Sequence, residues 1–226
     1  MLNFTFKDLE NCTREELIGK PSDLIINLFS KARLLPGWFT LDDFQYFYTL
    51  LKMQTFMDIQ GDILEIGCFH GRSSAVLASC LEKNERLTLV DAFDLMTFEN
   101  YQNPPTVEKF SSNFQKIMKN LDFSKIKIIK TLSKNLVLEK KENFRFIHID
   151  GAHDEETVLH DLKLVHPTLK VKGLLVLDDY HHPDFPGVAK ATDQFLKIYE
   201  KKYNILSDIN RHGALGRKLY LFKTSN

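Results

Sequence analysis

Three aspartates stand where two apolar runs of the sequence end, and their type and spacing suit metal chemistry. Asp150 closes the run 144–150, and Asp178 and Asp179 follow the run 173–177. If these runs are neighbouring parallel strands, the carboxylates meet at the carboxyl edge of one sheet. Such carboxylates repel one another unless a hard divalent cation lies between them, so the pattern predicts a metal site of Asp150, Asp178 and Asp179 holding Mg²⁺ or, as second choice, Mn²⁺. The alternative is that one aspartate caps a helix and another is solvated.

Histidines follow both positions. His153 comes three residues after Asp150, and its imidazole is placed to take a proton from a metal-bound hydroxyl, because neutral imidazole titrates near working pH. The same residue can instead contact a substrate or simply occupy the first turn of a helix. His181 and His182 follow Asp179 on a predicted loop, where they either touch metal or substrate or are solvated.

A glycine loop lies upstream of these residues. Gly67 and Gly71 follow the predicted strand 63–66, and a helix is expected to begin near Ser73. Glycine at a turn between strand and helix lets the backbone bend tightly and approach a ligand. Because Phe69 stands where a dinucleotide fingerprint has its second glycine, the loop argues against NAD.

Two acids flank this loop. Glu65 at the end of the first strand is placed to bind an ammonium group, and Asp91, 20 residues beyond Gly71, to accept hydrogen bonds from ribose hydroxyls. A ligand with an amino acid at one end, a ribose at the other and no phosphate is S-adenosylmethionine. Taken singly, Glu65 can also cap a loop and Asp91 a turn.

These residues need a parallel sheet to bring them together. From Asp62 onward, short β-rich runs alternate with helical stretches, which is typical of an α/β fold with helices on both faces of the sheet. Only residues 209–216 separate the last two strands, so they should form an antiparallel hairpin. The predicted strands are 63–66, 86–91, 126–130, 144–150, 173–177, 204–208 and 217–222.

The first part of the chain has a helical pattern. Apolar spacing predicts a helix over 23–35 that ends at Pro36-Gly37, and Thr40 followed by Asp43 predicts the cap of a second helix. We expect residues 1–60 to be a helical extension of the same domain that residues 61–226 build.

Several motifs together resemble a known family. They are Glu65-Ile66-Gly67 with Gly71 and Ser73, Val90-Asp91-Ala92-Phe93, the runs 146–153 and 172–180, Phe185-Pro186-Gly187-Val188 with Ala191, and Pro36-Gly37-Trp38 before the fold. This combination resembles class I S-adenosylmethionine-dependent methyltransferases, and in particular the family with macrolide-sugar O-methyltransferases and a cephalosporin-pathway enzyme. The resemblance covers residues from about Pro36 to the C-terminus.

The resemblance implies a Rossmann-like methyltransferase domain that uses S-adenosylmethionine and a divalent metal to methylate a hydroxyl of a small molecule, a sugar or natural-product intermediate. It adds Ser133 as a residue near the adenine. Catechol O-methyltransferases have a lysine at the place of His153, which leaves the role of this histidine open. The aromatic loop 93–105 is expected to form a substrate wall or lid, although its aromatic residues can equally be a packed surface cluster. The predicted catalytic residues are His153 and Asp150, and the predicted cofactor-binding residues are Glu65, Gly67, Gly71, Ser73, Asp91, Ser133 and Asp150.

Two other functions remain open. A non-catalytic subunit that binds S-adenosylmethionine would keep the glycine loop, although it would be expected to lose clustered carboxylates. A non-haem iron oxygenase would use His148 and Asp150, two residues apart on one strand, with a later histidine such as His181. Such triads normally lie on antiparallel folds, and His148 is expected to be a core residue.

The composition limits the classes of binding partner that are expected. Lys plus Arg equals Asp plus Glu at 30 each, so no overall charge attracts nucleic acid or an acidic membrane. The three cysteines lack zinc-like spacing, and the N-terminus lacks the apolar segment of a signal peptide, so we expect a cytoplasmic protein. A homo-oligomer is compatible with the sequence.

Overall fold

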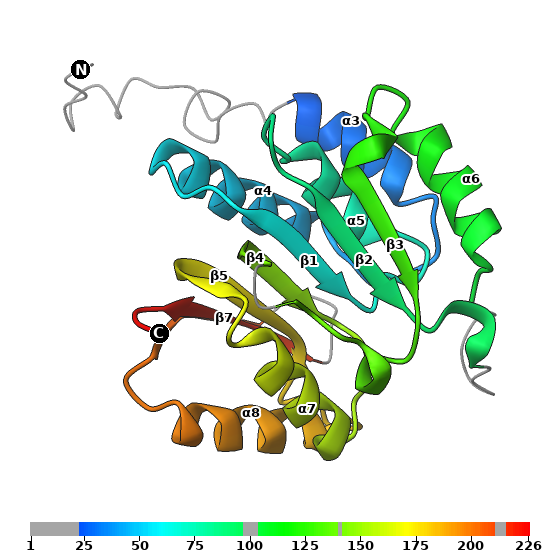
Figure 1. The fold of residues 1–226 in the computed structure, drawn as a ribbon. Coiled ribbons are helices and arrows are strands. Elements are labelled where there is room, and N and C mark those ends of the chain that lie inside the picture. Colours follow the sequence, from blue (N-terminus) through cyan, green and yellow to red (C-terminus); the bar gives the residue numbers. More distant parts are fainter. Residues whose placement is uncertain (1–22, 97–103, 140–141, 211–215) are drawn as a thin grey trace, which may run out of the picture.

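A seven-stranded mixed sheet forms the centre of the molecule (Figure 1). The computed structural model describes residues 23–96, 104–139, 142–210 and 216–226. The strand order is β3-β2-β1-β4-β5-β7-β6; the first five of these pair in parallel, and β7 runs antiparallel to both neighbours. This confirms the predicted fold class, including the C-terminal hairpin. The strands are β1 (Asp62–Ile66), β2 (Leu87–Asp91), β3 (Ile126–Lys130), β4 (Phe144–Ile149), β5 (Leu169–Tyr180), β6 (Tyr203–Asn210) and β7 (Arg217–Lys223).

Strand β5 is longer than the apolar run 173–177 predicted, while the other strands agree with their predictions to within two residues. Its first part carries exposed Val171 and Lys172, so it lacks the buried texture that marked the rest of the strand. At its other end the strand continues through Asp178 to Tyr180, which pairs with Arg217 of β7. The two aspartates therefore lie near the end of β5, where the register with β7 shifts between Leu177 and Tyr180.

The sheet is covered by helices on both faces, as predicted. Because side chains alternate along a strand, Phe146 and His148 of β4 face one layer while Ile147 and Ile149 face the other. None of the helices in the described ranges is long and apolar enough to cross a membrane. The first layer contains α3 (Asp23–Ala32), α4 (Leu41–Phe56), α5 (Arg72–Ser79) and α6 (Val107–Ile117), and the second contains α7 (Glu155–Val165) and α8 (Pro186–Ile198).

The N-terminal helices share a hydrophobic core with the sheet. Helix α4 begins at a capping box in which the Asp43 N–H donates to Thr40 Oγ1 at 3.2 Å and the Thr40 N–H donates to Asp43 Oδ2 at 2.9 Å. Phe44 and Phe47 of this helix are fully buried in the same cluster as Ile63 of β1. The packing thus places α4 directly over the face on which His148 lies.

Candidate active site

The glycine loop is held against the end of β4. Both Gly67 and Gly71 have φ of 87°, a backbone conformation that favours glycine. A Cβ on Gly67 would lie 1.9 Å from the carbonyl oxygen of Asp150, and one on Gly71 would lie 2.9 Å from Cε2 of Phe110. Helix α5 begins at Arg72, one residue before the predicted start near Ser73, and Gly71 is its N-cap. The predicted cofactor loop and the predicted metal ligand Asp150 are therefore in direct contact.

Asp91 fixes the loop from the neighbouring strand. Its Oδ2 accepts a hydrogen bond from the N–H of Phe69 at 2.7 Å, and its Oδ1 accepts one from the N–H of Phe93 at 2.7 Å. Burial raises the pKa of Asp91, and these two N–H groups act in the opposite direction. Each carboxylate oxygen retains a second lone pair, so the predicted contact with a ribose remains a prediction that this geometry permits.

Glu65 lies below the loop rather than in it. Its side chain has no solvent exposure, one carboxylate oxygen accepts the hydroxyl hydrogen of Ser74, and the other lies 2.9 Å from Nδ1 of His148. A ligand's ammonium group cannot reach this carboxylate without displacing the core. The geometry therefore does not support the predicted contact with the cofactor and gives Glu65 a role in positioning His148.

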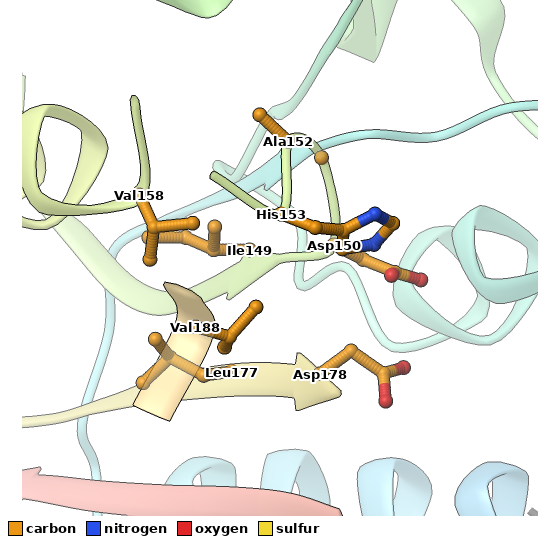
Figure 2. A pocket seen from close by; sticks show the side chains of 9 residues that line it. Ile149, Asp150, Ala152, His153, Val158, Leu177, Asp178 and Val188 are labelled. Carbon is orange, nitrogen blue, oxygen red and sulfur yellow. The ribbon is translucent and has the colours of Figure 1, made fainter. Parts of the chain in front are cut away.

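Among the described residues the three predicted metal ligands do not form one group; Asp150 instead belongs to two overlapping groups, one with Asp178 and the other with Asp179. Asp150 has ligand atoms within 4.8 Å of those of His148 and Asp178, and also within 4.8 Å of those of His153 and Asp179. Figure 2 shows the side chains of Asp150, His153 and Asp178 extending to the same side of the strands. Burial, followed by the nearby charge of Asp178, raises the pKa of Asp150 well above its usual range. A cation between these groups would relieve that conflict.

The cavity beside these carboxylates is small, at about 10 Å³, which suits a water molecule or an ion but not a nucleoside. Figure 2 shows apolar side chains on one side of this cavity and the polar side chains of Asp150, His153 and Asp178 on the other. Its lining consists of Ile149, Asp150, Gly151, Ala152, His153, Val158, Leu177, Asp178 and Val188.

Sequence reasoning missed Lys218 of β7. This lysine is fully buried, pairs closely with Oδ2 of Asp178, and places Nζ 3.9 Å from Oδ1 of Asp43. Its ammonium group also lies over the ring of Phe39, 4.8 Å from the centroid. The counter-charge expected from a metal is thus supplied in part by the protein. Nothing in the sequence marked Lys218, because a lysine near a strand end is normally exposed.

His153 is held by Asp179. Its Nε2 lies 3.2 Å from Oδ2 of Asp179, and its ring stacks on Phe185 with centroids 3.9 Å apart. Helix α7 begins at Glu155, with Asp154 as its N-cap, so the alternative that His153 occupies the first turn of a helix is wrong. The remaining two interpretations, a base or a substrate contact, both suit a half-buried imidazole at the mouth of the cavity.

The other loop histidines are less involved. His181 is exposed, and His182 uses Nδ1 to accept the N–H of Asp184 at 3.1 Å. Within the described ranges neither belongs to a group that can hold a metal. The alternative iron triad of His148, Asp150 and His181 is therefore not assembled in this structure.

The remaining predicted positions have mixed outcomes. Ser73 is buried in the first turn of α5, and Ser133 begins the 3₁₀ turn Ser133–Asn135, which contacts α7. Their contacts with the cofactor stay predictions. Phe93 was expected to form part of a substrate wall, but it is buried and packs edge-on against Phe110 at 5.5 Å, so this expectation is wrong. The rest of that aromatic loop, Phe98 and Tyr101, lies outside the described residues.

The segment before α4 contributes an aromatic surface that the sequence did not assign to the site. Trp38 is 66% exposed and stacks on Phe69 of the glycine loop, with centroids 5.9 Å apart. Arg72 secures this segment by donating from Nε to the carbonyl oxygen of Leu35 at 3.0 Å. The motif Pro36-Gly37-Trp38 was the only signal that pointed to it.

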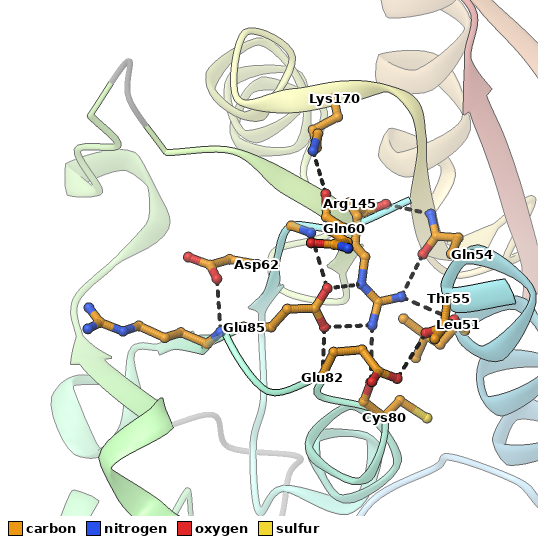
Figure 3. A network of polar contacts seen from close by, with 12 residues as sticks. Leu51, Gln54, Thr55, Gln60, Asp62, Cys80, Glu82, Glu85, Arg145 and Lys170 are labelled. Atoms are coloured by element: carbon orange, nitrogen blue, oxygen red, sulfur yellow. Dashed lines mark hydrogen bonds and ion pairs between the residues drawn. The ribbon is translucent and has the colours of Figure 1, made fainter. Parts of the chain in front are cut away.

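A second buried charged cluster lies towards the amino end of β4 (Figure 3). Arg145 is fully buried, and its guanidinium donates from Nε and Nη2 to the two carboxylate oxygens of Glu85 at 2.7 and 2.8 Å. Its other three hydrogen bonds go to the carbonyl oxygens of Leu51 and Cys80 and to Oε1 of Gln54. All five donors of Arg145 are used, so this cluster has no capacity left for a ligand.

Comparison with known proteins supports the same reading of the fold. Residues 64–180, just over half of the chain, match a family model described as "Methyltransferase domain". No functionally curated protein matches the sequence.

Several solved structures share the architecture at low sequence identity. The O-methyltransferase NovP is 15% identical with a TM-score of 0.69, each chain covering 84% of the other. CalS11, a TDP-rhamnose 3′-O-methyltransferase of calicheamicin biosynthesis, is 15% identical with a TM-score of 0.59. The match covers 93% of this chain and 95% of the CalS11 chain. TomG from Streptomyces achromogenes, an O-methyltransferase solved with S-adenosylmethionine, is 16% identical with a TM-score of 0.59, covering 93% and 94%.

Proposed function

The chain belongs to the methyltransferase-domain family, and from this premise we propose that it is an S-adenosylmethionine-dependent O-methyltransferase. We propose further that it methylates a hydroxyl of a small molecule with the help of a divalent metal ion. The observation that carries the proposal is the contact between Gly67 and Asp150. This contact places a loop that suits a cofactor without a phosphate group beside the acidic cluster.

The cofactor is assigned to the loop between β1 and α5. Asp91 stands at the end of β2 with a carboxylate lone pair on each oxygen for the ribose hydroxyls. Phe69 closes the position that a pyrophosphate would approach, which favours S-adenosylmethionine over NAD. Trp38, stacked on Phe69, extends this wall with an exposed aromatic face.

The residues at the carboxyl edge fit a divalent cation. Asp150, Asp178 and Asp179 would hold it, because burial and mutual repulsion leave Asp150 with a raised pKa that a cation would reverse. Mg²⁺ and Mn²⁺ are the ions that such oxygen ligands suggest first. When bound, the metal lowers the pKa of a coordinated substrate hydroxyl.

The protein's own residues then accept the proton of the acceptor hydroxyl and orient the base that takes it. His153 takes the proton of the acceptor hydroxyl on an imidazole nitrogen, while Asp179 orients the ring from 3.2 Å. The acceptor oxygen forms a bond to the methyl carbon as the carbon–sulfur bond breaks, and the electron pair stays on sulfur in S-adenosylhomocysteine. The net products are a methyl ether, S-adenosylhomocysteine and a proton held by His153.

The acceptor class is proposed from the family resemblance and from CalS11, which acts on a nucleotide-linked sugar. We propose a sugar hydroxyl or a natural-product intermediate. Phenolic acceptors are the comparison class in the test below.

The first test is calorimetric titration of the purified chain with S-adenosylmethionine, S-adenosylhomocysteine and NAD, each with and without Mg²⁺. We expect micromolar binding of the first two, on the order of −8 kcal/mol, and no binding of NAD. Binding of NAD alone, or of none of the three, would overturn the proposal. An acceptor panel of nucleotide sugars and phenols, with mass detection of a methyl group, then identifies the substrate class.

A second test separates catalysis from mere cofactor binding. Asp179→Asn should abolish methyl transfer while leaving the affinity for S-adenosylmethionine unchanged, because Asp179 contacts His153, the proposed base. This variant is preferable to Asp178→Ala, which would leave the buried Lys218 without its partner. No turnover by the unaltered chain with any acceptor would favour a non-catalytic binding subunit. Unchanged turnover in Asp179→Asn would instead show that the contact between Asp179 and His153 is not needed for catalysis.

A further inference from the structure

We propose that His148 is a metal ligand, and that its ring nitrogen makes the acidic cluster a site for a transition-metal ion such as Fe²⁺, Co²⁺, Ni²⁺ or Zn²⁺ in preference to Mg²⁺. This inference rests on the proposed function, because it concerns the metal of the same site. It adds a nitrogen donor from within β4 to a ligand set that the sequence predicted to be made of carboxylates alone.

The geometry of His148 differs from that of an ordinary core histidine. The side chain has no solvent exposure, and within the described part of the chain its Nε2 has no hydrogen-bond partner. This nitrogen lies 3.9 Å from Oδ2 of Asp178, and the histidine forms a group with Asp150 and Asp178 whose ligand atoms lie within 4.8 Å of one another. A buried polar atom without a partner is costly, and a bound cation would satisfy it.

The opposite side of the ring is fixed in the manner of metal-binding histidines. Nδ1 lies 2.9 Å from Oε1 of Glu65, and Ser74 hydrogen-bonds the other carboxylate oxygen. Because a carboxylate can only accept, Nδ1 carries the hydrogen and Nε2 is left to face the cluster. Histidine ligands commonly donate their second N–H to a carboxylate in this way, which fixes the ring and raises its basicity.

Aromatic packing prevents the ring from turning away. Phe47 packs against His148 edge-on, with centroids 4.9 Å apart at 88°, and Phe39 lies at 6.1 Å and 65°. Both phenylalanines come from the segment around the start of α4. A nitrogen donor is therefore held in place before any metal arrives.

The charge of the site leaves the choice between divalent ions to the nitrogen donor. Lys218 is paired with Asp178, which lowers the net negative charge that this carboxylate offers to a cation. Mg²⁺ relies on hard anionic oxygens, whereas the later divalent transition ions bind imidazole nitrogen well. One imidazole with partly neutralised carboxylates thus suits those ions better.

The affinity test uses Co²⁺ and Mg²⁺ as probes on the metal-free full-length chain, by calorimetry and by the visible absorption of bound Co²⁺. We expect the Kd for Co²⁺ to be at least about tenfold lower than for Mg²⁺, and His148→Gln to raise it about 10–100-fold while changing the Kd for Mg²⁺ much less. The matched control is His153→Gln, which removes the other histidine near Asp150. Equal affinities for the two ions in the unaltered chain would overturn the inference.

A second measurement does not depend on how well His148→Gln folds. The quadruple variant His153→Gln, His181→Gln, His182→Gln and His212→Gln leaves His148 as the histidine that groups with the cluster among the described residues. Mn²⁺ bound to this variant should show a ¹⁴N coupling by pulsed electron paramagnetic resonance that becomes a ¹⁵N coupling when histidine is labelled with ¹⁵N. A bound Mn²⁺ without histidine coupling would overturn the inference.

Failure of this inference and failure of the proposed function give different results. If Mn²⁺ binds without histidine coupling while S-adenosylmethionine binds and is consumed, the site is made of carboxylates and the methyltransferase proposal stands. If no metal binds but methyl transfer proceeds, both metal proposals fall. If S-adenosylmethionine does not bind, the function itself is overturned.

Discussion

Two buried charged clusters lie on the same strand, β4, and they differ in how completely their polar groups are paired. Arg145, towards the amino end, uses all five of its donors on Glu85, Gln54 and two backbone carbonyl groups. His148, three residues later, has one nitrogen on Glu65 and the other facing acids that it does not reach at hydrogen-bond distance. Both side chains are fully buried.

The difference teaches how to separate a structural charge from a functional one. Burying a charge is tolerated when its partners satisfy it completely, as at Arg145, and such a cluster fixes the arrangement of α4, β4 and the turn before β2. At the carboxyl edge the pairing is incomplete, and Asp150 carries a raised pKa because of burial and Asp178. Incomplete pairing of that kind indicates a place where a ligand completes the set.

The largest expected effect concerns chemistry at the carboxyl edge. His153→Gln should lower kcat for methyl transfer by about 10²–10⁴-fold, because the variant cannot take the proton of the acceptor hydroxyl. The Kd for S-adenosylmethionine should not change. Single-turnover kinetics with a responsive acceptor measures the first quantity and calorimetry the second. A fall of less than about threefold would assign His153 to substrate contact and leave the base unidentified.

The next effect tests the saturated cluster. Arg145→Met should destabilise the fold by about 3–5 kcal/mol, because it leaves the buried Glu85 without a counter-charge. The free energy of unfolding in urea measures this loss. In Arg145→Met with Glu85→Gln the loss should be smaller than in the single variant, since no unpaired charge remains. Equal losses in the two variants would show that packing, and not charge, determines the stability of this cluster.

Lys218 belongs to the incompletely paired cluster. The stability of a variant that lacks this lysine should therefore increase when a metal ion binds. Lys218→Met should cost about 2–3 kcal/mol, somewhat less than Arg145→Met, because methionine still packs on Phe39 and the remaining acids can take up a proton. A divalent metal should recover part of the loss in Lys218→Met by replacing the missing positive charge. Thermal unfolding with and without Mn²⁺ measures this recovery.

The matched comparison for that recovery is Arg145→Met, which should gain no more from Mn²⁺ than the unaltered chain does. If metal stabilises both variants equally, the ammonium group of Lys218 and the metal do not share a role. If metal stabilises neither, the acidic cluster is balanced by Lys218 and protons alone.

The sequence predicted the fold better than the contacts of the site, for a physical reason. Alternating apolar runs and the G-x-x-x-G turn depend on local periodicity, so the strands, the start of α5 and the Thr40 cap could all be read from the chain. Lys218 pairs with Asp178 across two strands that are 40 residues apart in sequence, and no local pattern encodes that contact. The sequence also did not indicate that the two carboxylate oxygens of Glu65 would contact Ser74 and His148.

Phe93 shows the same limit of sequence-based prediction. At Lys218 a contact of the site was not predicted, whereas at Phe93 a predicted role in the site is absent. Its position after β2 suggested a substrate wall, but its N–H is bound by Asp91 and its ring enters the core beside Phe110. An aromatic residue in a loop exposes or buries its ring according to the nearest available apolar surface, and α6 supplied that surface. The sequence alone does not say where a distant helix will pack.

The smallest expected effect concerns His166, a buried histidine outside the carboxyl-edge cluster. His166 follows α7, its Nδ1 lies 2.8 Å from the hydroxyl oxygen of Tyr203, and its ring packs on Tyr199 with centroids 3.9 Å apart. Burial, and then the charge of Lys223, lowers the pKa of His166 to about 4. The unfolded chain therefore binds a proton at this residue first as the pH falls below the ordinary value of about 6.5.

The stability that depends on neutral His166 is present above pH 6.5 and is lost progressively as the pH falls towards 4, by on the order of 1–2 kcal/mol. His166→Gln should abolish this part of the acid dependence of unfolding, whereas His160→Gln, at a partly exposed position on α7, should leave it in place. Urea unfolding at pH 7, 5.5 and 4.5 measures both slopes. If His166→Gln leaves the slope unchanged, the neutral state of His166 does not cause the acid dependence. The carboxyl-edge cluster cannot supply it either, because the raised pKa of Asp150 makes protonation there favour the folded state.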